Sequence, residues 1–161
     1  MRYWVWIWIA FPMKLDMHKT KREGVYLGFD FGTKAIGIAV GQSITKTASP
    51  LTTLHAQNGA PHWDQIQEII NEWLPIGLIV GLALQPDGSH SETSRAAQRF
   101  GNRLHGRFQL AVHFIEERLT SVEAQARLKE APPMVQAHRC LDAMAAAIIL
   151  ESWLNDGNQL I

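Results

Sequence analysis

Four carboxylates in this sequence occupy positions that a hydrophobic core does not require. Asp30 ends an apolar run, Glu116 and Glu117 end another, and Asp142 begins the last apolar stretch of the chain. Like-charged carboxylates are stable together only around a cation, and Mg²⁺ or Mn²⁺ prefers such oxygen ligands. A metal held there neutralises a phosphodiester and lowers the pKa of a bound water, so convergence of these acids predicts a metal-dependent phosphodiesterase. The alternative is that they are solvated turn residues and a helix N-terminal charge.

Residues able to contact phosphate lie in two further places. The glycine-rich segment 28–41 contains Thr33 and Lys34 at a turn, where a hydroxyl and an ammonium group can reach a phosphate. Glycines in an apolar strand also indicate close approach of a ligand or another backbone. Arginines that share one face of a predicted helix, and could hold successive phosphates of a nucleic acid, are Arg95, Arg99 and Arg103. The alternatives are a hairpin without a ligand and a solvated helix face.

The elements that carry these residues follow from hydrophobic spacing and turn residues. Apolar runs at 25–29 and 35–40, across a glycine-containing turn, predict a β-hairpin, and Pro50 marks an edge strand. The remaining predicted elements are that edge strand at 45–54, helices at 63–73, 91–104 (capped by Ser91), 121–129 and 141–154, and strands at 78–82 and 110–115. This order predicts an α/β fold, a mixed sheet flanked by helices. Strand periodicity does not separate Glu116 from Glu117, because both faces of their strand are apolar.

Length and composition exclude several classes of protein. The 161 residues suit one domain, and 47% hydrophobic with 19% charged residues is ordinary for a globular chain. Basic and acidic residues balance at 15 each, which disfavours a protein that coats DNA. Cys140 is the only cysteine, so no intramolecular disulfide forms, and we expect a cytoplasmic protein.

The chain opens with an apolar run, residues 3–11, in which three tryptophans alternate with other apolar residues. The run is shorter than the roughly 20 residues that span a bilayer, and it lacks the cleavage site of a signal peptide. We therefore expect no stable membrane association and interpret the run as an extension that an upstream start site would explain. The predicted division is an extension at 1–22, a domain at 23–157 and a tail at 158–161.

Four segments together resemble the YqgF (also called RuvX) family of ribonuclease H-like proteins. They are LGFDFGTKAIGIAVG, IVGLALQPDGSHSETSRAAQRFGNRL, EERLTSVEAQ and LDAMAAAIILESWL, and they cover residues 25–154 in order. The resemblance implies a ribonuclease H-like fold with a five-stranded mixed sheet, three antiparallel strands followed by two parallel ones. It also implies Mg²⁺ or Mn²⁺ bound by the catalytic residues Asp30, Glu117 and Asp142, with Glu116 kept as an alternative to Glu117.

The segment before Asp142 departs from the family pattern. This chain has AHRCLD there, with Cys140 in a place where the family often has lysine, and it lacks the usual glycine. The loop between Lys129 and Asp142 is also short. Arg139 is the candidate that would supply the missing positive charge.

The resemblance implies a nuclease, a hydrolase of ester bonds, that matures the 5′ end of precursor 16S ribosomal RNA during ribosome biogenesis. The expected partners are precursor ribosomal RNA and ribosomal particles. The sequence is compatible with both a monomer and a homodimer. Two alternatives are Holliday-junction or other DNA cleavage by the same residues and a catalytically silent RNA-binding module. A sugar-kinase-like ATPase also has an Asp-x-Gly-Thr hairpin, but it needs a second lobe for which this chain has no room.

Overall fold

The computed structural model describes residues 21–83, 85, 87–117, 126, 129–130 and 141–156. Residues 1–20, most of the predicted helix at 121–129 and the AHRC segment lie outside these residues. The elements are β1 (Val25–Phe31), β2 (Ala35–Gln42), β3 (Thr47–Gln57), β4 (Ala60–Pro61), α1 (Trp63–Trp73), β5 (Gly77–Ala83), α2 (Glu92–Phe108), β6 (Ala111–Glu117) and α4 (Leu141–Asn155). Among the described residues, no helix has the length and apolar character needed to cross a membrane.

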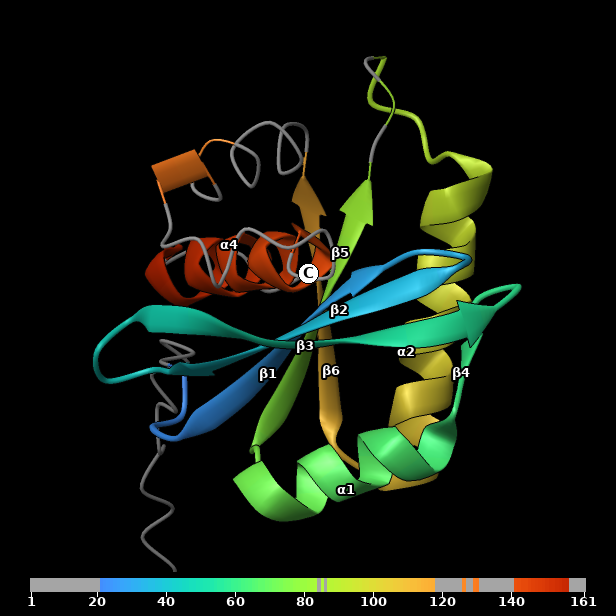
Figure 1. Ribbon diagram of the computed structural model, residues 1–161. Helices are drawn as coiled ribbons and strands as arrows, with labels where there is room; N and C mark the ends of the chain where they lie inside the picture. The colour runs from blue at the N-terminus through green and yellow to red at the C-terminus, as the bar shows by residue number, and fades with distance from the viewer. Residues whose placement is uncertain are drawn as a thin grey trace, which may run out of the picture.

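The strands form a mixed sheet in the order β4-β3-β2-β1-β5-β6 (Figure 1). β1 pairs antiparallel with β2, and β2 pairs antiparallel with β3. β5 runs parallel to β1, and β6 runs parallel to β5. This is the predicted ribonuclease H-like arrangement. The described sheet has six strands instead of the predicted five, because the two-residue strand β4 pairs with the end of β3.

Local sequence signals explain where elements begin and where the sheet ends. α2 follows Ser91, whose hydroxyl oxygen accepts a hydrogen bond from the backbone N–H of Ser94 at 3.0 Å, as the capping prediction requires. Pro50 lies on the outer strand β3, which β4 covers only at Ala56 and Gln57. The missing N–H of the proline therefore breaks no pairing on the outer edge, and the predicted edge position is confirmed.

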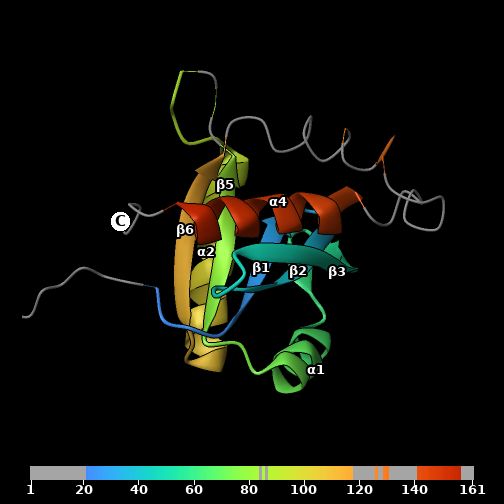
Figure 2. The ribbon, with the colours of Figure 1, turned by 90° about the vertical axis from the view of Figure 1, so that its left-hand side faces the viewer.

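Helices cover both faces of the sheet (Figures 1 and 2). On the face that we call the α2 face, α1 and α2 bury their apolar side chains against Leu27, Phe29 and their neighbours. On the opposite face, the α4 face, α4 packs against Tyr26, Ala39 and Ile79. Because successive side chains of a strand point to opposite faces, each buried strand supplies both cores alternately.

Lys21, just before β1, contacts the end of α4. Its ammonium nitrogen lies 4.5 Å from the centroid of the Trp153 ring and donates to the backbone carbonyl oxygens of Trp153 and Asp156. Burial lowers the pKa of Lys21, and the negative charge of Asp156 opposes that shift. Lys21, the first described residue, is therefore packed against the domain.

Candidate active site

Asp30 lies near the carboxyl end of β1, on the α4 face of the sheet. The alternation along β1 fixes this orientation, because Phe29 belongs to the core on the α2 face while Gly28 lies beneath α4. The Asp30 side chain is half-buried. β5 and β6 run parallel to β1, so their carboxyl ends reach the same edge of the sheet. This edge, which we call the carboxyl edge, is where open α/β sheets bind ligands.

Gly37 connects Asp30 with Asp142. In the antiparallel ladder Gly37 is the direct partner of Asp30. A Cβ atom at Gly37 would lie 1.9 Å from the carbonyl oxygen of Asp142 and 2.7 Å from the nitrogen of Ala143. The first turn of α4 therefore rests directly on the backbone next to Asp30, which only glycine permits. The sequence indicated close approach by a ligand or a backbone, and at Gly37 the neighbour is a backbone.

The half-buried position of Asp142 affects its ionisation. Burial raises the pKa of the Asp142 carboxyl, because the charged form loses hydration. Loss of hydration is a cost that a bound cation compensates, so the position is suited to a metal ligand.

Asp142→Asn should therefore stabilise the metal-free protein near pH 7, by a few tenths of a kcal/mol because water still reaches this half-buried group. The native protein holds the proton more strongly than the unfolded chain does, so the cost of the charge disappears as the pH falls through the raised pKa. Urea unfolding in EDTA should show the gain at pH 7 and little difference at pH 4. The exposed Glu68→Gln is the charge-matched control, and a loss of stability in Asp142→Asn at pH 7 would contradict this account.

The parity of β6 distinguishes Glu116 from Glu117. Phe114 packs on the α2 face, whereas Ile115 belongs to the core beneath α4. Glu116 has the parity of Phe114 and is exposed. Glu117 is described by its backbone alone, and its position has the parity of Ile115, opposite Ala83 of β5. By its backbone position, Glu117 therefore has the parity of the α4 face, the face of the sheet that carries Asp30.

The spacing between Asp30 and Glu117 follows from the sheet register. Val80 of β5 pairs with both Phe29 and Phe114, so Glu117 lies two residues further along than Asp30. The two Cα positions are thus about 10 Å apart across two strand spacings and about 7 Å apart along the strands. Long carboxylate side chains with a cation between them can bridge a separation of this order.

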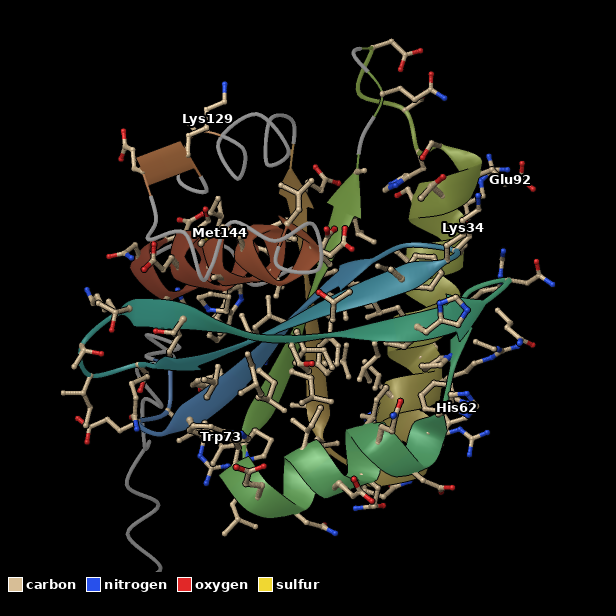
Figure 3. All side chains as sticks on the ribbon, viewed as in Figure 1. Lys34, His62, Trp73, Glu92, Lys129 and Met144 are labelled. Carbon is tan, nitrogen blue, oxygen red and sulfur yellow. The ribbon has the colours of Figure 1, made fainter. Side chains whose placement is uncertain are left out.

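Thr33 and Lys34 follow Asp30 in the turn between β1 and β2, and both are exposed. Figure 3 labels Lys34 at this turn. Neighbouring backbone holds the turn in place: the N–H of Gly59 donates to the carbonyl oxygen of Thr33 at 2.9 Å, and the N–H of Ala56 donates to that of Lys34 at 2.8 Å. Their hydroxyl and ammonium groups are thus carried by a fixed backbone close to Asp30.

The three predicted arginines lie elsewhere. Arg95, Arg99 and Arg103 are exposed on α2, which packs on the opposite side of the sheet from α4. The sheet and α2 therefore lie between the three arginines and the face that carries Asp30.

The donor set fits a divalent cation. Asp30 and Asp142 offer the hard oxygen ligands that Mg²⁺ and Mn²⁺ take. Among the side chains that the structure describes, no three His, Cys, Asp or Glu residues form a metal-binding group. The third predicted ligand, Glu117, is not among those side chains.

The topology of the sheet defines an α/β protein of the ribonuclease H-like class, and the comparisons with known proteins make it a nuclease, a hydrolase of phosphodiester bonds. A family model named RuvX, described as "Holliday junction resolvase", matches residues 24–156. The chain belongs to the RuvX family.

Curated relatives match over most of their length. A protein of Nitrosococcus oceani is 47% identical over 142 residues, which are 88% of this chain and 93% of that protein. One of Azotobacter vinelandii is 50% identical over 129 residues, 80% of this chain and 91% of that protein. Both are described as proposed pre-16S rRNA nucleases. A solved structure of Thermus thermophilus RuvC with a Holliday junction substrate has 16% identity and a TM-score of 0.49, and the match covers 81% of this chain and 93% of that one.

Proposed function

We propose that this protein is a Mg²⁺- or Mn²⁺-dependent nuclease that matures the 5′ end of precursor 16S ribosomal RNA in the cytoplasm. The observation that carries the proposal is the contact at Gly37, which brings the start of α4, and with it Asp142, against the strand partner of Asp30. The names of the curated relatives support the choice of RNA as substrate.

Asp30, Asp142 and Glu117 are the proposed metal ligands. When bound, the metal supplies charge neutralisation at the scissile phosphate and acidifies a bound water. The residues of the chain do the positioning: the β1 ladder fixes Asp30, and the packing of α4 fixes Asp142. Lys34 and Thr33, on the anchored turn, are proposed to hold a phosphate of the substrate beside the acids.

The substrate test compares two nucleic acids. Purified full-length protein with Mg²⁺ or Mn²⁺ should cut a precursor RNA at the mature 5′ end of 16S rRNA, and EDTA should stop the reaction. The second substrate is a four-way DNA junction, because the family model carries the description of a Holliday junction resolvase. Symmetric cutting of the junction by a dimeric protein, with the RNA left intact, would replace the RNA proposal by the DNA one.

The parity of β6 yields a prediction about the two neighbouring glutamates. Glu117→Gln should lower the cleavage rate about 100-fold or more, since it removes a proposed metal ligand. Glu116→Gln, which removes the same charge on the exposed α2-face position, should stay within about threefold of the wild type. Single-turnover cleavage assays measure both rates. The assignment fails if Glu116→Gln has the larger effect.

A further inference from the structure

We propose that the outer face of α2 binds the single-stranded flank of the RNA through Arg95, Arg99 and Arg103, which we call the arginine stripe. This inference rests on the proposed function, and it adds the path that the RNA takes away from the acids. The flank passes over the carboxyl edge of the sheet and continues along the side opposite Asp30.

The orientation of α2 turns the arginine stripe to solvent. α2 buries Ala97, Phe100 and Leu104 against the sheet. At 100° per residue, the arginine stripe falls on the opposite side of the helix, and all three arginines are exposed. The stripe is therefore open to a partner.

The charges of the stripe are not neutralised within the described part of the chain. None of the three guanidinium groups has a hydrogen bond, ion pair or ring contact with another described residue. Arg107, one helical turn further along α2, differs because its guanidinium lies 4.4 Å from the Trp63 ring centroid. Like charges four residues apart repel each other and weaken a helix. A solvated helix face ordinarily alternates its charges. This one has a single acid, Glu92 at its start, and then concentrates positive charge, which favours a polyanion.

The stripe begins at the carboxyl edge. Ser91, the cap of α2, donates a hydrogen bond from its hydroxyl to the carbonyl oxygen of Ala83, the last residue of β5, at 3.4 Å. Arg95 follows one turn later, and Arg99 and Arg103 lie at intervals of about 6 Å along the helix axis. That interval is comparable with the distance between successive phosphates of an extended single strand. The stripe is thus a row of three phosphate contacts that leads away from the edge where Asp30 lies.

The test measures binding without cleavage. All proteins carry Asp30→Asn and are kept in EDTA, and the probe is a fluorescent single-stranded RNA of about 20 nucleotides, longer than the site sizes common for single-strand binding. The stripe variant is Arg99→Gln with Arg103→Gln. The charge-matched control is Arg22→Gln with Lys46→Gln, two exposed cations at the other end of the sheet. Fluorescence anisotropy at several salt concentrations gives the Kd and its salt dependence.

The stripe variant should bind about tenfold more weakly, and the slope of log K against log salt should become shallower by about 1.4, or 0.7 for each lost phosphate contact. The control should stay within about twofold. Equal losses in both variants, or wild-type binding by the stripe variant, would overturn the inference. The inference would also be overturned if an RNA duplex of the same length bound as strongly as the single strand and lost the same affinity in the stripe variant.

Two further outcomes separate this inference from the proposed function. Because removal of like charges relieves repulsion along α2, the melting temperature of the stripe variant should not fall, which excludes unfolding as the cause of weaker binding. If RNA binding depends on the arginine stripe but the wild-type protein cuts no RNA, the nuclease proposal alone is rejected. RNA cutting by the wild type, with no binding defect in the stripe variant, would reject the arginine stripe alone.

Discussion

Asp30→Asn should reduce cleavage about 1000-fold or more while the protein keeps its fold. The substitution replaces one carboxylate oxygen by an amide nitrogen that cannot bind a hard cation. Loss of an outer partner of a metal ligand already costs about 10- to 100-fold, so loss of a direct ligand should cost more. Single-turnover cleavage of the precursor RNA gives the rate, and circular dichroism checks the fold.

A thermal shift provides a second measurement that does not depend on activity. Mn²⁺ should raise the melting temperature of the wild type, because a ligand that binds the folded state stabilises it, and it should leave Asp30→Asn unchanged. Asp64→Asn, an exposed acid at the start of α1, is the matched control and should behave as the wild type does in both assays. An equal Mn²⁺ response in wild type and Asp30→Asn would argue against Asp30 as a ligand.

Gly37→Ala should be the most damaging substitution of a small residue in the described part of the sheet. The added methyl group would lie 1.9 Å from the Asp142 carbonyl oxygen, which belongs to backbone and cannot rotate away. α4 must shift, at a cost of about 3 kcal/mol or more, a large share of the stability of a small domain. A displacement of about 1 Å at a reacting centre also costs about 100-fold in rate, so the folded fraction should be nearly inactive.

Two other glycines serve as controls for Gly37. Gly28→Ala meets the Ala146 carbonyl oxygen at 2.8 Å, one turn further along α4, and should lower stability with a smaller loss of activity per folded molecule. Gly106→Ala on α2 meets nothing within 4 Å and should stabilise the protein by about 0.5–1 kcal/mol. Urea unfolding and the cleavage rate of the folded fraction measure these effects. Wild-type activity in Gly37→Ala would show that α4 does not set the geometry of the acids.

Much of the fold could be predicted from short-range signals. The hairpin of β1 and β2, the cap at Ser91 and the span of α1 each depend on residues within one element, and the structure confirms them. α2 continues to Phe108 instead of ending near residue 104, because Phe108 packs on the core one helical turn after Leu104. The strand β4 escaped prediction because two residues carry no periodicity.

The candidate site required information that the sequence lacks. Both faces of β6 are apolar because helices cover both faces of the sheet, so only the packing of Phe114 and Ile115 reveals the parity at residues 116 and 117. The role of Gly37 depends on the register of β1 and β2 and on where α4 begins. The sequence signal for this close contact was a glycine within an apolar strand, next to the strand that carries Asp30. The face of the sheet on which α2 packs is likewise a tertiary property, so the sequence alone does not show on which side of the sheet the three arginines lie.

The packing of α4 has a consequence for genetics. Nine of its residues are buried, among them Ala146, Leu150 and Trp153, so the helix that carries Asp142 is also a principal part of the core. Detachment of α4 from an otherwise folded domain would be costly, because it would expose these buried side chains. The amides of its buried turns should therefore exchange with solvent only through global opening. A screen for inactive alleles should therefore recover α4 substitutions mainly as missing protein. Inactive but abundant protein should come from positions such as Asp30, where chemistry and folding are separable.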